Sequence, residues 1–451
     1  MRSKKKGEKL EVRSGKGRQD ESFSVQNSQC LIPRLRFPEF RGKEGWKMTP
    51  LGQLSKLVRG PFGGSLKKEI FVSTGYAVYE QQHAIYSDFR TFRYFITEEK
   101  FRELRRFAIA ANDIIMSCSG TMGKFAIIPD GAADGVINQA LLKLTPNGYC
   151  DIRFLKEVLE LPSVQEKLLS QSAGGAIKNV VSVKQIKALP LRLPGTDEQQ
   201  KIAECLSSVD MAIAAQARKL DALKTHKKGL MQQLFPREGE TQPRLRFPEF
   251  RGKEEWEVKM LDELVDFQSG GTPSKANAEY WNGSVPWVSA KDMKQLFLAD
   301  SEDHISASAV DNGAKLVPSG ALLMLVRGMT LLKDVPICVL RREMSFNQDV
   351  KALRPKNNVD GLFLALLLTG NKNRLLEMVT IAGHGTGKLD TDELKTMVLT
   401  LPRSAEQQHI ANCLSTLDDL INAATQKLEA LKTHKRGLMQ QLFPSPEEVK
   451  A

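Results

Sequence analysis

A chain of 451 residues is longer than the roughly 100 to 200 residues of a typical domain, which predicts two or more folded units. With 41% hydrophobic and 26% charged residues, the composition excludes a chain that is disordered throughout. The formal net charge of +12 favours a polyanionic partner, either nucleic acid or an anionic membrane surface.

The chain begins with a strongly basic stretch, in which residues 1–20 hold eight Lys or Arg against three Asp or Glu. We expect residues 1–32 to form a disordered basic tail, and a solvated arm explains it better than a specific DNA clamp. No apolar core of a signal peptide follows, and no apolar run reaches the roughly 18 residues needed to cross a bilayer. We therefore expect a cytoplasmic protein without membrane contact.

The six cysteines show no CxxC spacing and no paired histidine cluster. This pattern predicts neither a zinc site nor a disulfide framework. We expect no metal and no cofactor in this chain.

The first copy of a tandem repeat opens with PRLRFPEFRGKE at residues 33–44, followed by Trp46. Residues 47–195 then hold short apolar runs broken by Gly and Pro, which predict strands at 108–111, 114–117 and 125–128. A short helix is expected at 151–161. This block is predicted to be a mixed α/β globule.

The second copy opens with the identical twelve residues at 243–254, followed by Trp256. Its block, residues 257–403, predicts a strand at 321–326 and a helix at 361–368. Each block is followed by a near-duplicate segment, because residues 197–236 match 405–444 at 27 of 40 positions. The chain is thus two half-length copies in tandem.

Both near-duplicate segments step by four and three between apolar positions, which is the seam of a coiled coil. Each predicts a helix of about 38 residues, roughly 55 Å long. A helix of this length can pack on its own globule, but five heptads kept in two copies favour pairing of the two helices with each other. The predicted pairing residues are Ile202, Leu206, Val209, Ile213, Leu220, Leu223, Ile410, Leu414, Leu417, Ile421, Leu428 and Leu431.

The predicted fold class is α/β (α+β): two mixed domains separated by two long antiparallel coiled-coil helices, related by a pseudo-two-fold axis. The predicted boundaries are residues 1–32 for the tail, 33–195 and 243–403 for the domains, and 196–242 and 404–451 for the helical spacers. Two globules held apart in this way fit duplex DNA, which presents like faces about every 34 Å.

Glycine turns with polar neighbours recur at matching positions of the two blocks. Backbone N–H groups in such turns can approach phosphate, and Arg, Lys, Asn and Gln can bind base edges. For any single residue, a solvated turn or a buried amide is about as good an explanation. The candidates from these turns are Lys124, Asn138, Gln139, Lys178, Asn179, Arg327, Asn347, Gln348 and Lys388.

Motifs for catalysis or nucleotide binding are missing from the sequence. The loop at 383–388 fails the Walker A spacing, because Ala382 and Leu389 stand at two of its required positions. There is no GxGxxG in the context of a dinucleotide fold and no Asn-Pro-Pro-aromatic run of the adenine methyltransferase kind. His226 and His434 lie on the repeated helices, where a surface position explains them better than catalysis.

Taken together, the residues from about 33 onward resemble type I restriction specificity subunits, with two target recognition domains each followed by a long helix. The likeness rests on an LP…EQ…I…L…D pattern, which here is Leu193, Pro194, Glu198, Gln199, Ile202, Leu206 and Asp210, and then Leu401, Pro402, Glu406, Gln407, Ile410, Leu414 and Asp418.

The start of each block adds to the resemblance. Residues 270–292 are similar to the opening of many such domains, and the first block, at 60–68, is a looser match. This likeness adds five candidate DNA-binding residues: Lys67, Lys68, Lys275, Trp287 and Lys291.

The resemblance implies a non-catalytic subunit that binds double-stranded DNA and two methyltransferase subunits, giving S-adenosylmethionine-dependent N6-adenine methylation of a bipartite site. ATP-dependent motor subunits, which also need Mg²⁺, would complete a restriction endonuclease. The repeated helices and the two PRLRFPEFRG segments are the candidates for docking these partners, although a purely architectural role is equally good.

Two alternatives belong to other classes. A non-catalytic scaffold could bind proteins or RNA through its two globules. A self-contained nuclease or methyltransferase would need catalytic motifs that this sequence lacks.

Overall fold

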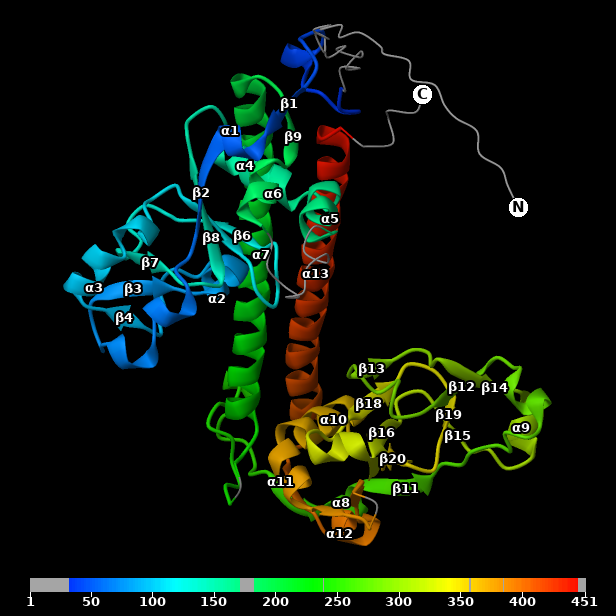
Figure 1. Cartoon of the computed structure of the whole chain (residues 1–451). Helices are drawn as coiled ribbons and strands as arrows, with labels where there is room; N and C mark the ends of the chain where they lie inside the picture. Colours follow the sequence, from blue (N-terminus) through cyan, green and yellow to red (C-terminus); the bar gives the residue numbers. More distant parts are fainter. Residues whose placement is uncertain (1–31, 171–181, 238, 357, 384, 445–451) are drawn as a thin grey trace, which may run out of the picture. The chain divides into compact units, whose positions relative to one another are not determined.

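The computed structural model describes residues 32–170, 182–237, 239–356, 358–383 and 385–444 (Figure 1). The predicted basic tail lies outside these ranges except for Ile32, as do Lys178 and Asn179. The chain forms two compact units: unit 1 holds residues 1–212 and 431–451, and unit 2 holds residues 213–430.

Each long helix belongs to both units. Helix α7 (Thr196–Leu234) begins in unit 1 and ends in unit 2, whereas α13 (Ser404–Leu442) begins in unit 2 and ends in unit 1. They are the green and red helices of Figure 1. We call this division of each long helix between the two units the exchange of helix ends. The predicted boundaries, which divide the chain into consecutive segments, do not describe it.

Unit 1 is a mixed α/β globule, as predicted. A four-stranded sheet has the order β2-β8-β5-β6, a three-stranded sheet has the order β4-β3-β7, and β1 pairs with β9. Its strands are β1 (Lys47–Pro50), β2 (Ser55–Arg59), β3 (Tyr76–Tyr79), β4 (Phe95–Ile96), β5 (Ile114–Ser117), β6 (Phe125–Ile127), β7 (Gly135–Ile137), β8 (Leu141–Pro146) and β9 (Pro190–Leu193). Its short helices are α1 (Leu51–Leu54), α2 (Gln81–Tyr86), α3 (Glu98–Glu103), α4 (Ile152–Glu160), α5 (Pro162–Ser170) and α6 (Val183–Lys187), with 3-10 turns η1 (Pro38–Phe40), η2 (Gly63–Ser65), η3 (Lys68–Ile70) and η4 (Arg105–Phe107).

Unit 2 repeats this plan with longer sheets, of orders β11-β20-β16-β18-β13, β14-β12-β19-β15 and β17-β22-β21, and with β10 paired to β23. Its strands are β10 (Glu257–Met260), β11 (Val265–Ser269), β12 (Val285–Val288), β13 (Phe297–Leu298), β14 (Asp303–Ile305), β15 (Leu316–Val317), β16 (Leu322–Leu325), β17 (Arg327–Gly328), β18 (Ile337–Leu340), β19 (Met344–Phe346), β20 (Val350–Pro355), β21 (Val379–Ile381), β22 (Gly387–Leu389) and β23 (Val398–Leu401). Its helices are α8 (Leu261–Leu264), α9 (Ala307–Asp311), α10 (Gly361–Gly370), α11 (Lys372–Glu377) and α12 (Thr391–Lys395), with 3-10 turns η5 (Pro248–Phe250), η6 (Ala278–Trp281) and η7 (Met329–Leu332). Along the described ranges, none of the helices combines the length and apolar character that a membrane span requires.

The predicted local elements follow from the apolar pattern. Strand β5 is buried at every residue because Ile114 and Met116 pack in one apolar cluster and Ile115 packs in another. Strand β16 is likewise buried at every residue, within the core of unit 2. Helices α4 and α10 begin at Asp151 and Asp360, whose carboxylates accept hydrogen bonds from backbone N–H groups of the first turn. The strand predicted at 108–111 is wrong: this segment follows η4 and turns at Asn112, whose φ is +69°, and only Ala108 makes an isolated bridge.

The core of each unit contains the beginning of one long helix and the end of the other. In unit 1, Ile202 and Leu206 of α7 are buried in the same cluster as Leu442 and Phe443 at the end of α13. In unit 2, Ile410 and Leu414 of α13 share a cluster with Leu234 and Phe235. The first turns of each helix therefore pack on their own globule, which was the weaker of the two expectations for the seam.

Further along, the two helices pack against each other in antiparallel directions, as predicted. In unit 2, Leu220, Ala424 and Leu428 form an apolar cluster, with Ile213, Leu223 and Ile421 packed against it. Gln216 Nε2 donates to the Ala424 carbonyl oxygen over 2.9 Å, and Lys227 Nζ lies 2.5 Å from Asp418 Oδ1. In unit 1 the equivalent Lys435 Nζ lies 2.7 Å from Asp210 Oδ2. Such polar pairs in a seam fix its register.

The PRLRFPEFRG segments fasten each globule to its long helix. Arg36 donates to both carboxylate oxygens of Glu198, at 2.8 and 2.7 Å, and also to the carbonyl oxygens of Lys43 and Glu44. Arg246 makes the same bonds to Glu406, at 2.8 and 2.8 Å, and to two carbonyl oxygens of its own segment. All four of these side chains are 15% exposed or less. These two arginines therefore have an architectural role.

Candidate nucleic-acid interface

In unit 2, four turns from distant parts of the chain meet at one place, which we call loop cluster 2 (residues 270–272, 326–329, 347–349 and 387–388). Gly270 lies so close to the carbonyl oxygens of Phe346 and Asn347 that an added Cβ would be 2.3 Å from each. Gly271 N donates to the Phe346 oxygen over 2.9 Å. Only glycine allows this approach, so the loop after β11 is pressed against the loop after β19.

The other two turns of loop cluster 2 are joined to these by backbone contacts. Val326 N and Arg327 N both donate to the Asp349 carbonyl oxygen, at 2.8 and 3.2 Å. Strand β17 then pairs with β22, so that Arg327 stands directly opposite Lys388. Gln348 is exposed, and its side chain contacts the Thr272 hydroxyl. The structure thus brings together Arg327, Gln348 and Lys388, which are 61 residues apart in sequence at most.

Unit 1 has a similar arrangement of three segments, which we call loop cluster 1 (residues 59–62, 117–124 and 138–140). A Cβ on Gly60 would lie 1.8 Å from the Asn138 carbonyl oxygen, and Arg59 Nε donates to the Gln139 carbonyl oxygen over 3.2 Å. Cys118 N donates to the Ala140 carbonyl oxygen over 2.8 Å. Lys124, an exposed residue at the end of the middle turn, donates from its backbone N to Ser117 Oγ over 3.0 Å.

Asn138 and Asn347 act as shapers of their turns. Asn138 Oδ1 accepts from Ala140 N at 3.0 Å, and Asn347 Oδ1 accepts from Asp349 N at 3.2 Å. Asn347 is only 9% exposed. The neighbouring Gln139 and Gln348 are exposed, so they are the better candidates for contact with a ligand.

The candidates taken from the family resemblance are placed elsewhere. Trp287 is 6% exposed, and its ring Nε1 donates to the Gly271 carbonyl oxygen over 2.9 Å. It therefore supports loop cluster 2 from inside, and its direct contact with DNA stays a prediction that this burial does not favour. Lys291 is held by Asp303 and Glu302, with Nζ to carboxylate distances of 2.9 and 3.2 Å.

Three lysines from the same resemblance are exposed outside the loop clusters as defined here: Lys67, Lys68 and Lys275. Lys67 and Lys68 precede Ile70, which packs with Leu66 on the apolar cluster of Val78 and Ile96. Lys388, by contrast, lies within loop cluster 2 with Nζ 2.9 Å from Asp390.

Sequence reasoning missed several side chains at these clusters. In unit 1 they are the half-buried Arg59 and the exposed Phe62, on either side of the close approach at Gly60; in unit 2 they are the exposed Thr272 and Met329. The signal that could have found them is the glycine that follows the first strand of the larger sheet, which is Gly60 after β2 and Gly270 after β11. That these two glycines are equivalent becomes visible only when the two blocks are compared in the structure.

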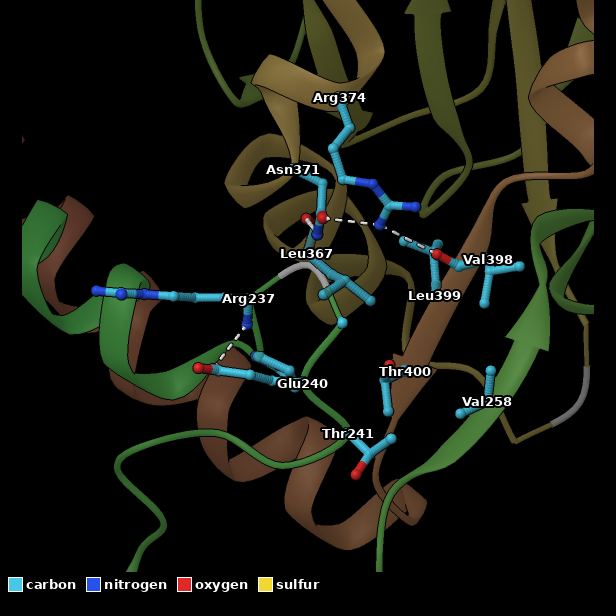
Figure 2. A pocket seen from close by; sticks show the side chains of 12 residues that line it. Arg237, Glu240, Thr241, Val258, Leu367, Asn371, Arg374, Val398, Leu399 and Thr400 are labelled. Carbon is cyan, nitrogen blue, oxygen red and sulfur yellow. Dashed lines mark hydrogen bonds between the residues drawn. The ribbon is translucent and has the colours of Figure 1, made fainter.

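A separate hollow of about 290 Å³ in unit 2 lies at the end of α7 (Figure 2). Its polar groups bind one another: Arg374 Nη1 donates to Asn371 Oδ1 over 3.3 Å and to the Val398 carbonyl oxygen over 3.2 Å. Glu240 accepts from Arg237 N over 3.2 Å on the opposite side. None of the residues that line this hollow belongs to loop cluster 2, so we do not assign the hollow to ligand binding.

The family model for the type I restriction modification DNA specificity domain matches the chain twice, over residues 43–225 and 253–433. The matches cover more than half of the 451 residues, so the chain belongs to this family. Each match begins directly after a PRLRFPEFRG segment and ends within a long helix.

Curated specificity subunits are similar to this chain. It is 32% identical over 206 residues to the type I restriction enzyme EcoR124I/EcoR124II specificity subunit of Escherichia coli, covering 44% of this chain and 50% of that protein. It is 23% identical over 442 residues to the MjaVIII specificity subunit of Methanocaldococcus jannaschii, covering 92% of this chain and 96% of that protein. The match to the MjaIX specificity subunit of the same archaeon, at 28% identity, spans 40% of this chain and 41% of that protein. The chain thus spans half or less of two of these three relatives.

Solved structures share the fold. The S subunit of the type I restriction-modification system from M. genitalium has a TM-score of 0.60 at 16% identity, covering 92% of this chain and all of that one (100%). A chain from a structure of the type I R-M system, solved for its assembly and conformational transition, has a TM-score of 0.54 at 16% identity, with coverage of 89% and 98%. The expected tandem fold with two specificity domains is therefore confirmed.

Proposed function

We propose that this chain selects the DNA sequence on which a type I restriction-modification enzyme acts. Unit 1 reads one half of a bipartite, asymmetric site and unit 2 reads the other. The observation that carries this proposal is the double match of the DNA specificity domain, once to each block. A scaffold that binds proteins or RNA has no comparable support.

The loop clusters are the surfaces proposed to meet DNA. In loop cluster 2, Arg327 and Lys388 place two cations side by side on paired strands, and the exposed amide of Gln348 lies on the adjoining turn. Cations supply the salt-dependent attraction to phosphate, while a guanidinium or amide can bind the edge of a base. Paired strands hold these groups more rigidly than a loop alone, which favours selective binding.

The chain is proposed to carry no catalysis of its own. Two methyltransferase subunits would transfer the methyl group of S-adenosylmethionine to the N6 atom of adenine, and motor subunits would use ATP and Mg²⁺ to drive cleavage. The complex would act in the cytoplasm, where the host DNA lies. Partners would dock on the outward faces of the long helices, since Arg36 and Arg246 are already engaged in fastening the globules.

The test is a comparison of methylated adenines in host DNA with and without this gene, by sequencing that detects methylation. We expect the intact gene to produce one two-part motif that disappears on deletion. A host whose methyladenine pattern is the same with and without the gene would contradict the proposal. The purified complex provides a second test, because its affinity for that motif should exceed its affinity for unrelated duplexes.

A further inference from the structure

Unit 1 contains a hollow of about 680 Å³ beside loop cluster 1. Its charged lining consists of Arg59, Arg106 and Lys187, and none of its other lining residues, all within the described part of the chain, carries a carboxylate. A concave surface with three cations and no anion attracts a polyanion. Its size is in the range of sites that hold a small organic group.

Phe62 also lines this hollow, and the residue is 93% exposed. The chain on both sides of the ring is held in place: Gly60 N donates to the Leu141 carbonyl oxygen over 3.0 Å, and Ser65 N donates to the Phe62 carbonyl oxygen over 2.9 Å. An exposed phenyl ring on an anchored turn, beside a hollow lined by three cations, suits a ligand that is both anionic and aromatic. A nucleotide has both properties.

Arg59 provides a second, independent observation. Its Nε donates to the Gln139 carbonyl oxygen, but its Nη1 is buried and makes no hydrogen bond within the described part of the chain. A buried guanidinium N–H without an acceptor is unfavourable. An acceptor in the hollow can satisfy it once the guanidinium turns toward the hollow that Arg59 lines.

Building on the proposed DNA-reading function, we propose that loop cluster 1 opens one base step of its half-site. The Phe62 ring packs against the base face that becomes exposed, and Arg59 donates to the O6 and N7 acceptors of a guanine. Base faces are covered in stacked DNA, so this contact requires local unstacking, which inserted apolar side chains achieve in other DNA-binding proteins. Guanine is the base whose major-groove edge offers two acceptors to an arginine.

The inference is specific to unit 1. The position equivalent to Phe62, two residues after the glycine of the close approach, is Thr272 in unit 2, where the hydroxyl contacts Gln348. Unit 2 therefore has no ring to insert at this position. Unstacking is expected in one half of the recognised motif, and the other half serves as an internal control.

The test uses the full-length chain in complex with its methyltransferase partners and duplexes that carry the motif found in host DNA. The fluorescent base analogue 2-aminopurine replaces each base in turn, because its emission rises when it unstacks. We expect a rise at one step of one half-site with the unaltered chain, its loss with Phe62→Ala, and its retention with the control Tyr86→Ala, which removes another exposed aromatic ring of unit 1 outside loop cluster 1. Phe62→Ala should also weaken binding roughly 5- to 150-fold.

A separate arm tests Arg59. Replacing the contacted guanine by 7-deazaguanine, which lacks the N7 acceptor, should weaken binding by the unaltered chain and have much less effect on Arg59→Lys. Unchanged melting of Phe62→Ala verifies that the fold is intact. If the unaltered chain directs a two-part motif but Phe62→Ala leaves fluorescence and affinity unchanged, this inference is overturned alone. If the unaltered chain directs no such motif, the proposed function fails, and this inference fails with it.

Discussion

The two halves of the chain agree closely where each globule is joined to its long helix, and they differ where they would meet DNA. Arg36 with Glu198 and Arg246 with Glu406 make the same bonds within 0.1 Å at the carboxylates. Loop cluster 1 presents Arg59 and Phe62, whereas loop cluster 2 presents Thr272, Arg327 and Lys388. Residues that are identical in the two copies therefore hold the architecture together. Residues that differ at equivalent positions are the ones that we expect to give each unit its own half-site.

The same comparison holds for the packing of the helix ends. In unit 1, the Trp46 and Phe154 rings contact Phe443 at centroid distances of 5.8 and 5.6 Å. In unit 2, Phe363 contacts Trp256 at 6.1 Å and Phe235 at 5.7 Å. Each trio takes its last ring from the end of the helix that began in the other unit. Each globule thus depends on residues from both copies.

The largest effect is expected from removing a junction arginine. Arg36→Ala leaves the Glu198 carboxylate buried without its partner and should destabilise unit 1 by about 3–5 kcal/mol. Hydrogen exchange of β5 amides reports on unit 1 and that of β16 amides on unit 2. Arg246→Ala should have the mirror-image effect. Equal loss of protection in both units for each variant would contradict the assignment.

A smaller effect, on DNA rather than on stability, is expected from Arg327→Ala. The loss of one guanidinium contact should cost about 1–3 kcal/mol of discrimination and relax the motif at one position of one half. Binding assays on single-base variants of the motif provide the measurement. Lys67→Ala is the matched control, since Lys67 is an exposed cation outside loop cluster 1 as defined here. If the control relaxes the motif as much as Arg327→Ala does, the loop clusters are not the reading surface.

Phe443→Leu should destabilise unit 1 by about 1 kcal/mol, because two aromatic contacts are lost while most apolar volume is kept. The matched variant Phe235→Leu should act on unit 2. The same hydrogen-exchange comparison resolves them. Were Phe443→Leu to loosen unit 2 instead, the exchange of helix ends would be incorrect.

The smallest effect concerns pH. Burial raises the pKa of the Glu157 carboxyl above its usual range, and nearby Lys156 and Lys435 only partly offset this. The folded state then binds the proton more tightly than the unfolded state, so stability falls as pH rises from the ordinary glutamate pKa through the raised one. Glu157→Gln should remove that fall, so that its stability exceeds that of the unaltered chain at neutral pH but not at low pH. Thermal melting between about pH 4 and pH 8 measures this; a difference that is constant with pH, or of opposite sign, would count against it.

Much of the architecture could be predicted from the sequence because it follows from the tandem repeat and from the periodicity of apolar residues. The identical junction segments, the heptad seam and the continuous apolar runs of β5 and β16 each specify their element locally. The exchange of helix ends was not accessible, since Phe235 and Phe443 carry no sign of which globule covers them. The loop clusters were partly accessible: Arg327 and Lys388 were predicted one by one, but their pairing depends on β17 meeting β22. Phe62 was missed because exposure of a single ring depends on the surrounding fold.

The two blocks are attached to the repeated junctions and long helices in equivalent ways, because the antiparallel pairs β1–β9 and β10–β23 join the start of each block to its end. The account therefore predicts that either block can recognise its half-site from either position in the chain. The most direct measurement is the methyladenine motif written by a complete system whose chain carries the second block, residues 257–403, in place of residues 47–195 as well. We predict that the half-site read by unit 2 then appears in both parts of the motif. An unchanged motif from a folded, active chain would contradict the account.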